Sequence, residues 1–219
     1  MARGIHPTRD LEREVLAGLG PRAILAGVDE VGRGSLAGPV SVGICLIDAS
    51  TSNGFPAGLR DSKLLSPARR EVLDPQCRRW GMDLAVGHAG PEVIDAEGII
   101  VALRRAAAAG LAQLAARGHT PDAVLLDGRH DWWAGDSMLP QVPVRMQVKG
   151  DASCCVIAAA SVSAKVERDH MMVMLDHQYP GYDWASNKGY ASARHVDGLR
   201  TLGPSPMHRR SWHLPGVSA

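Results

Sequence analysis

Four carboxylates follow apolar segments of the kind that form buried strands. Asp29 and Glu30 come after ILAGV, Asp127 ends AVLLD, and Asp151 follows VPVRMQVKG. Side chains at strand ends stand at the edge of a sheet, where α/β proteins bind ligands. Carboxylates gathered there repel one another unless a cation neutralises them, and hard oxygen ligands suit Mg²⁺ or Mn²⁺. Because two such ions can hold a phosphodiester, activate water and stabilise the leaving oxygen, the pattern indicates phosphodiester hydrolysis.

Ordinary structural roles compete with this interpretation. Asp127 precedes a glycine, and Asp-Gly is common turn chemistry. Asp151 stands where a helix is expected to begin, and an acid is favourable near a helix N-terminus. Either residue alone is more often structural than catalytic. Acids at three strand ends, one of them a doublet, shift the balance towards a site.

The doublet adds a geometric condition. Neighbours on a regular strand point to opposite faces of the sheet. For Asp29 and Glu30 to share one site, the strand must therefore end or bulge between them. Gly32 and Gly34 follow at once, and glycine tolerates such a distortion. We expect the strand to bend or stop at this point.

The remaining segments describe the frame that positions these acids. Apolar runs predict five strands, at 23–31, 37–48, 82–90, 123–128 and 142–150, and helical patterns cover 8–18, 66–81, 91–117 and 152–177, with room for one short helix after Tyr190. Pro75 is expected to interrupt the second helix. Three early strands with short connections suggest an antiparallel meander, and the long helical crossover suggests parallel pairing of the later strands. The prediction is a mixed five-stranded α/β sheet flanked by helices, with residues 1–180 as its domain and 181–219 as a helical extension packed on it.

Composition narrows the class of protein. The 219 residues carry a net charge of +1, which by itself does not announce a nucleic-acid binder. The four cysteines show no CxxC spacing, so a zinc site is not expected. We expect four reduced thiols, as in a cytoplasmic protein. No apolar run is expected to span a bilayer. The sequence therefore predicts a soluble, cytoplasmic monomer without membrane partners.

Six motifs resemble one known family in order and spacing. They are GVDEVGRGSLAGPV (27–40), LRDSKLLSPARR (59–70), VLLDG (124–128), VKGDASCCVIAAASVSAKVERD (148–169), NKGYASARHV (187–196) and HRRSW (208–212). Over roughly residues 24 to 213 the chain resembles ribonuclease HII, the bacterial type 2 ribonuclease H. The DE-x-GRG and KGD…AAAS…AKV-x-RD elements are specific in combination. Ser35 departs from the pattern, since proline is common at this position after GRG.

The resemblance implies a ribonuclease H-like fold and a metal-dependent endonuclease. The implied metal ligands and catalytic residues are Asp29, Glu30, Asp127 and Asp151. The substrate would be RNA paired with DNA, or single ribonucleotides within duplex DNA, as in ribonucleotide excision repair. Cleavage would fall on the 5′ side of the ribonucleotide and leave a 3′-hydroxyl and a 5′-phosphate. The residues implied to recognise the 2′-hydroxyl are Gly32, Arg33, Gly34 and Tyr190. A buried core ring is the alternative for Tyr190.

Other positions carry weaker signals. Ser62, Lys63 and Lys149 are candidates for contacts with backbone phosphates, with a solvated loop as the equal alternative. Asp169 is a candidate to support the metal ligands without binding the metal itself. It is expected on a helix with Lys165 and Arg168, where surface ion pairs are the usual alternative. The cluster His208, Arg209 and Arg210 faces either DNA or solvent.

Two other functions fit parts of the pattern. A 3′–5′ exonuclease of the same fold would also use four acids, but it usually carries Asp-x-Glu instead of an adjacent Asp-Glu pair. A non-catalytic binder of RNA–DNA hybrids would bind without cleaving, and four intact acids argue against it. All-DNA substrate separates the first alternative from a ribonuclease, and cleavage in Mg²⁺ or Mn²⁺ separates the second.

Overall fold

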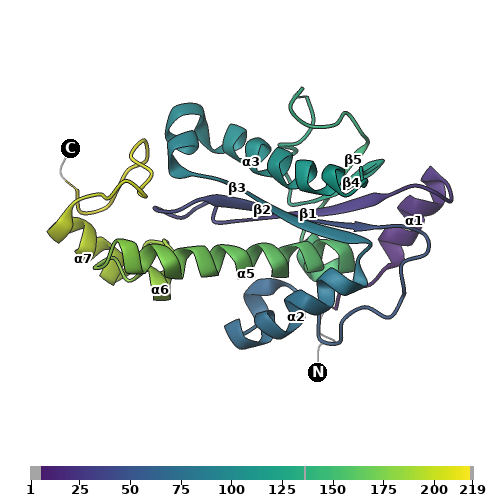
Figure 1. Ribbon diagram of the computed structural model, residues 1–219, viewed down its shortest axis with the longest axis horizontal. Helices are drawn as coiled ribbons and strands as arrows, with labels where there is room; N and C mark the ends of the chain where they lie inside the picture. Colours follow the sequence, from purple (N-terminus) through teal and green to yellow (C-terminus); the bar gives the residue numbers. More distant parts are fainter. Residues whose placement is uncertain (1–5, 136, 218–219) are drawn as a thin grey trace.

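The sheet has five strands in the order β3-β2-β1-β4-β5 (Figure 1). The computed structural model describes residues 6–135 and 137–217. The strands are β1 (Leu25–Val31), β2 (Val40–Ile47), β3 (Asp83–Ala89), β4 (Ala123–Asp127) and β5 (Val144–Gln147). β1, β2 and β3 pair antiparallel, whereas β4 pairs parallel with both β1 and β5. The expected meander and the expected parallel half are both confirmed.

Helices cover both faces of this sheet. They are α1 (Asp10–Leu19), α2 (Pro67–Trp80), α3 (Pro91–Ala116), α4 (Gly150–Ser153), α5 (Cys155–Gln178), α6 (Trp184–Asn187) and α7 (Ala193–Leu202), with a 3-10 turn at Ser62–Leu64. Figure 1 shows α3 on one face and α5 on the other, with α2 packed outside α5. Two buried cores result, one on each side of the sheet. The predicted mixed sheet flanked by helices is confirmed.

Glycines let the two long helices approach the strands closely. A Cβ atom at Gly27 would lie 2.6 Å from Val156 of α5, and one at Gly43 would collide with the backbone of Ala160. On the opposite face, a Cβ atom at Gly87 would meet the backbone of Ala106 in α3. The contact between the long helices and the sheet is thus made by small residues packed closely together. This suits a chain with few aromatic residues.

The expected break at Pro75 is wrong, because α2 runs through it. Proline removes the N–H that would bond the carbonyl four residues earlier, here that of Glu71. Both residues are exposed while Leu73 and Cys77 face the core. The proline therefore lies on the outer face of α2, where water can solvate the orphaned carbonyl.

One helix in the described part of the chain, α3, is long and apolar enough to cross a bilayer by length and composition. The expectation that no segment passes this test is wrong. Its buried residues, such as Leu103 and Ala106, belong to the same core as Ile44 of β2 and Ala85 of β3. This contact gives α3 the position of a core helix.

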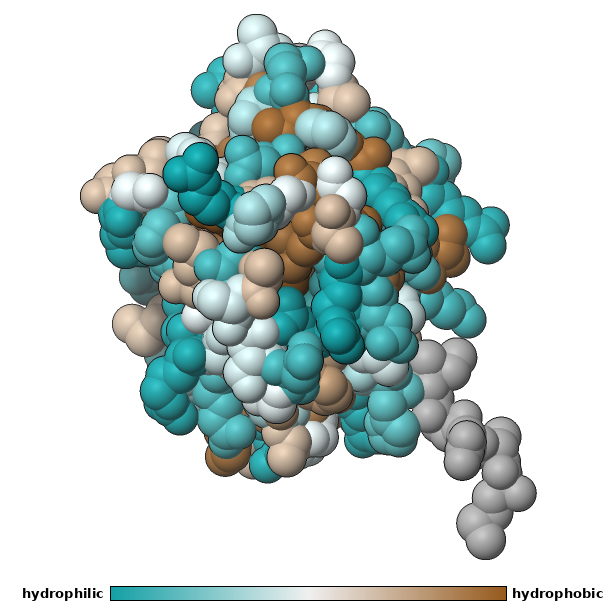
Figure 2. Space-filling view, turned by 90° about the vertical axis from the view of Figure 1, so that its right-hand side faces the viewer, coloured by the Kyte–Doolittle hydropathy of each residue, from teal (hydrophilic) through white to brown (hydrophobic). Residues whose placement is uncertain are grey.

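The opposite ends of the sheet differ in character. Figure 2 shows the end that carries α1, where the coloured residues are mainly hydrophilic and brown ones form small patches between them. At the other end α6, α7 and the chain after them pack on α5 and on the segment after β1, around a third core centred on Trp184 and Tyr182. The loop after β1 thus lies under a separate C-terminal layer.

Candidate active site

Three of the four predicted acids come together. Carboxylate oxygens of Asp29, Asp127 and Asp151 all lie within 4.8 Å of one another. Val28 pairs with Leu126 in the parallel β1–β4 ladder, so Asp29 and Asp127 are the next residues on adjacent strands. Because parallel strands end at the same edge, the two carboxylates meet there. The sheet topology itself therefore builds two thirds of this cluster, called the acidic triad below.

A sharp turn after β5 brings the third acid. Lys149 adopts a left-handed conformation with φ of 56°, and the short helix α4 begins directly after it. The N–H of Gly150 donates to Oδ1 of Asp127 over 2.7 Å. This bond fixes the start of α4 against the end of β4, so that Asp151 enters the triad from the next residue.

Electrostatic repulsion marks the triad as a cation site. Burial raises the pKa of Asp29 well above its ordinary value, and the charge of Asp127 raises it further, while the Ser161 hydroxyl opposes the change. Burial also raises the pKa of Asp151, followed by the charge of Asp127. Lys63 Nζ lies 3.3 Å from Oδ2 of Asp151, but 73% of this lysine side chain is exposed. The donor set of close, partly uncompensated carboxylates fits a divalent ion.

Glu30 does not join the triad in this conformation. β1 keeps regular pairing with β2 through Glu30–Val42 and Val31–Ser41, so the expected bend or early end of the strand is wrong. Oε1 of Glu30 instead accepts from Nη1 of Arg33 over 3.2 Å. Regular alternation explains the separation of the doublet, because successive side chains leave a strand on opposite faces.

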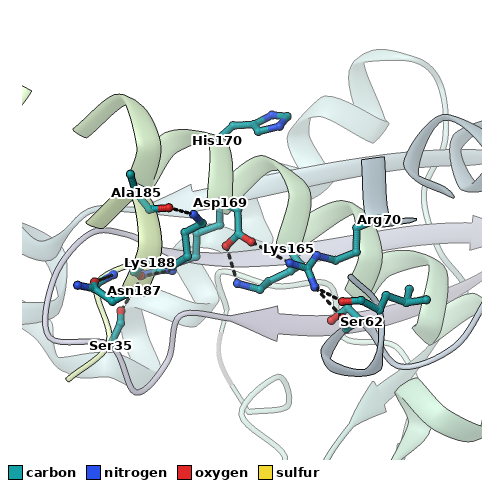
Figure 3. Close-up of polar contacts among 12 residues, drawn as sticks. Ser35, Ser62, Arg70, Lys165, Asp169, His170, Ala185, Asn187 and Lys188 are labelled. Carbon is teal, nitrogen blue, oxygen red and sulfur yellow. Dashed lines mark hydrogen bonds and ion pairs between the residues drawn. The ribbon is translucent and has the colours of Figure 1, made fainter. Parts of the chain in front are cut away.

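Asp169 lies behind the triad as part of a polar chain. Figure 3 shows it facing Lys165 and Arg70, which donate to it over 2.5 and 3.3 Å. Arg70 also donates to the backbone carbonyl of Ser62 over 3.0 Å, and Ser62 Oγ accepts from Ser161 over 2.9 Å. Since Ser161 favours the charged form of Asp29, Asp169 connects to the triad through these three residues without touching it.

The candidate phosphate contacts occupy different environments. Ser62 is buried with its hydroxyl bonded to Ser161, which corrects the expectation of a phosphate contact because the side chain serves the interior. Lys63 and Lys149 are exposed at the borders of the triad. The two lysines remain available to a phosphate backbone beside the acids.

The candidate ribose contacts gather on a pair of buried arginines. Arg209 donates to the carbonyls of Gly32 and Arg33 over 2.6 and 2.7 Å. The guanidinium carbon of Arg168 lies 5.7 Å from the centre of the Tyr190 ring, which is 39% exposed. Both arginines are fully buried, so the expectations of a surface ion pair at Arg168 and of an exposed basic cluster at Arg209 are wrong.

Sequence reasoning missed these supporting residues. Arg70, Ser161 and the two buried arginines act through backbone and side-chain bonds between segments far apart in the chain. The available signal was that all four lie in motif segments, Arg70 in 59–70, Ser161 and Arg168 in 148–169, and Arg209 in 208–212. Nothing in the residue types separated a buried arginine from a solvated one.

A mixed sheet of this topology, with acids meeting at the ends of β1 and β4, defines a metal-dependent nuclease with the ribonuclease H fold. The family model described as Ribonuclease HII matches residues 26–214. The chain belongs to the ribonuclease HII family, whose members act on nucleic acid and depend on divalent metal ions. It is therefore a ribonuclease H.

Relatives and solved structures support this assignment over most of the chain. Ribonuclease HII of Streptomyces avermitilis is 46% identical over 206 residues, which cover 94% of this chain and 83% of that one. The crystal structure of ribonuclease H2 from Pyrococcus horikoshii superposes with a TM-score of 0.69 at 27% identity, covering 87% of this chain and 94% of that chain. Ribonuclease HII from Archaeoglobus fulgidus, solved as a complex with PCNA, superposes with a TM-score of 0.68 at 25% identity. The match covers 86% of this chain and 93% of that chain.

Proposed function

We propose that this ribonuclease H cleaves the RNA strand of RNA–DNA hybrids and also single ribonucleotides within duplex DNA. Cleavage falls 5′ to the ribonucleotide and leaves a 3′-hydroxyl and a 5′-phosphate. The observation that carries the proposal is the position of the acidic triad at the end of β1, followed within five residues by the Gly32–Gly34 loop. Hydrolytic chemistry and a surface for a ribose thus lie side by side.

The acids divide the work of the reaction. Asp29, Asp127 and Asp151 would hold Mg²⁺ or Mn²⁺, which supplies water activation and charge stabilisation, with a pair of ions as the favoured arrangement. Asp29 and Asp151 face the attacking water, while Asp127 and Glu30 orient the scissile phosphate. Glu30 leaves its contact with Arg33 to do so. Asp169 stiffens the support behind Asp29 through Arg70 and Ser62.

The remaining residues bind the duplex. Lys63 and Lys149 contact backbone phosphates next to the triad, because both are exposed cations at its border. Gly32, Arg33, Gly34 and Tyr190 contact the ribose, whose 2′-hydroxyl separates RNA from DNA. Residues 181–219 form a substrate-binding extension of the catalytic domain at 1–180. We place the enzyme in the cytoplasm as a monomer acting in removal of ribonucleotides from DNA.

Mapping the cleavage site on a duplex with one ribonucleotide tests the proposal. In Mg²⁺ or Mn²⁺ the wild-type chain should cut once, 5′ to the ribonucleotide, and leave an all-DNA duplex intact. Asp29→Asn should abolish the cut, and Glu97→Gln, at an exposed acid paired with Arg105 on α3, should preserve it. Degradation of the all-DNA duplex would indicate an exonuclease, and binding without cleavage a passive hybrid binder. Wild-type activity in Asp29→Asn would refute the triad assignment.

A further inference from the structure

In the loop after β1, the carbonyls of Gly32 and Arg33 are bound, whereas the amides of Arg33 and Gly34 are unpaired within the described residues. The Gly32 carbonyl accepts from Arg209 Nη2 over 2.6 Å and from Ser35 Oγ over 2.9 Å, and the Arg33 carbonyl accepts from Arg209 Nη1 over 2.7 Å. Within residues 6–135 and 137–217, no acceptor bonds the backbone N–H of Arg33 or Gly34. Gly34 is exposed, with open space on its Cβ side. The loop therefore offers hydrogen-bond donors to a ligand.

A second arginine, Arg168, also supports this loop. Arg168 donates to the Pro39 carbonyl over 2.8 Å, to the Lys188 carbonyl over 2.9 Å and to Ser35 Oγ over 2.8 Å (Figure 3 labels Ser35 and Lys188). Its side chain occupies the space that a Cβ atom at Gly32 would need. Gly32 also has a φ of +82°, so both the turn and the close approach require glycine.

Tyr190 is tied to this assembly as well. The carbonyl of Gly189, the residue before it, accepts from the N–H of Leu36 over 2.8 Å. The Tyr190 ring lies over the Arg168 guanidinium. Movement of either arginine would therefore displace the loop amides and the tyrosine together.

Neither arginine has a carboxylate within ion-pair distance in the described part of the chain. Burial lowers the pKa of both, that of Arg209 to about 9, with the charge of Arg168 adding to the effect. Burying an unpaired cation is costly, and only the rigid fork of a guanidinium can bond several carbonyls at fixed angles. A lysine would keep the charge and lose this geometry.

We propose that Arg209, together with Arg168, positions the Gly32–Gly34 loop so that the amides of Arg33 and Gly34 meet an oxygen acceptor, the ribose 2′-hydroxyl. The inference rests on the proposed function. Affinity for a duplex comes mainly from phosphate contacts, which these buried residues do not make. Their effect therefore falls on kcat, through the alignment of the ribonucleotide with the triad, and little on KM.

Arg209→Lys tests the positioning role, with Arg105→Lys as the matched control, because Arg105 is exposed on α3 and paired there with Glu97. The readouts are kcat and KM on the single-ribonucleotide duplex, affinity for an all-DNA duplex, and the thermal midpoint. Misplacement by about 1 Å can cost about 100-fold in rate. We expect kcat of Arg209→Lys to fall about 10- to 100-fold, with KM and all-DNA affinity within about twofold and the control unchanged.

A milder variant covers the case in which Arg209→Lys does not fold. Ser35→Ala removes one donor to the Gly32 carbonyl and one acceptor of Arg168, and it should lower kcat several-fold with KM unchanged. Wild-type kcat in a folded Arg209→Lys, or in Ser35→Ala when the lysine variant does not fold, overturns the inference. A variant that loses kcat, all-DNA affinity and thermal midpoint in parallel also overturns the inference, because such a loss reflects general damage to the fold. An inactive wild-type chain instead refutes the proposed function.

Discussion

Two groups of like charges are buried in this protein, and they are satisfied in different ways. The acidic triad places three carboxylates within 4.8 Å of one another, with one mostly exposed lysine nearby. The arginine pair, Arg168 and Arg209, is surrounded by backbone carbonyls that accept its hydrogen bonds. The triad needs a cation from outside to be complete, whereas most donors of the arginine pair find acceptors within the chain, the Nε of Arg209 being the exception.

The difference separates a site from a scaffold. A cluster that repels itself gains stability when it binds a ligand of opposite charge. A cluster whose donors are mostly bonded within the chain gains little from a ligand and holds its neighbours in place instead. Burial of charge alone therefore does not identify a binding site, and the distribution of partners around the charge does.

Removing a buried charge should have opposite effects in the two regions, and the larger effect is expected at the arginine pair. Arg168→Met leaves the carbonyls of Pro39 and Lys188 without their donor. Unsatisfied buried polar groups cost about 1 to 3 kcal/mol each, so the free energy of unfolding should fall by about 3 kcal/mol or more. Urea unfolding measures this change, and a variant as stable as the wild type would contradict the scaffold role.

Asp29→Asn should instead stabilise the metal-free protein. Two charges no more than 4.8 Å apart repel by at least about 3 kcal/mol at an effective dielectric constant near 20. The amide oxygen can still accept from the N–H of Glu30. We expect the free energy of unfolding in chelator to rise by about 2 kcal/mol. Addition of Mg²⁺ should raise the thermal midpoint of the wild type more than that of the variant. A destabilised Asp29→Asn would show that the triad is balanced without a cation.

The arginine region should also weaken in mild acid. Ser205 N–H donates to Nδ1 of His208, and His195 Nδ1–H donates to the Tyr190 carbonyl. His195 Nε2 then accepts from both Trp184 Nε1–H and His208 Nε2–H. These contacts need both rings neutral. Burial lowers the pKa of His208 to about 4, with the charge of His195 as the next cause, and burial lowers that of His195.

The sign follows from proton binding. In the unfolded chain, the His208 side chain takes up a proton below the ordinary histidine pKa near 6.5. In the folded protein it stays neutral until about pH 4. Stability is therefore full above pH 6.5 and is lost as pH falls towards 4, by about 2 to 3 kcal/mol from His208. His208→Gln should flatten this part of the curve of unfolding free energy against pH. An unchanged slope would place the loss elsewhere.

The smallest effect is expected at the exposed rim of the triad. Lys63→Met removes an ion pair with Asp151 whose lysine is largely solvated, so stability should change by less than about 1 kcal/mol. Loss of a phosphate contact should reduce the slope of log affinity against log salt by about 1. Titration of a hybrid duplex at several salt concentrations measures the slope. Arg105→Met, on α3, should leave the slope unaltered.

The sequence contained most of the frame and part of the site. Apolar runs located all five strands, and their connections predicted the mixed pairing. Acids at the ends of β1 and β4 were predictable as neighbours, because parallel strands share an edge. The path of β1 past Glu30 was not predictable, since glycines permit a bulge without requiring one.

The burial of the two arginines could not be predicted from residue types. Charged residues are rarely buried without a charged partner, so Arg168 and Arg209 were expected at the surface. Their backbone partners are the carbonyls of residues 32, 33, 37, 38, 39 and 188, and every residue carries a carbonyl. Only the assembled fold reveals which ones converge. Pro75 is similar, because its tolerance depends on which face of α2 it occupies.

The bond between Arg209 and the Arg33 carbonyl joins positions 176 residues apart. On the ribosome, a chain emerges from its N-terminus, so the three acids of the triad leave the exit tunnel well before Arg209 does. A nascent or truncated chain that ends after α5 would carry every member of the triad and lack the support of the Gly32–Gly34 loop. The support of this loop is thus assembled last, and under the proposed function only full-length protein would combine cutting with selection of the sugar.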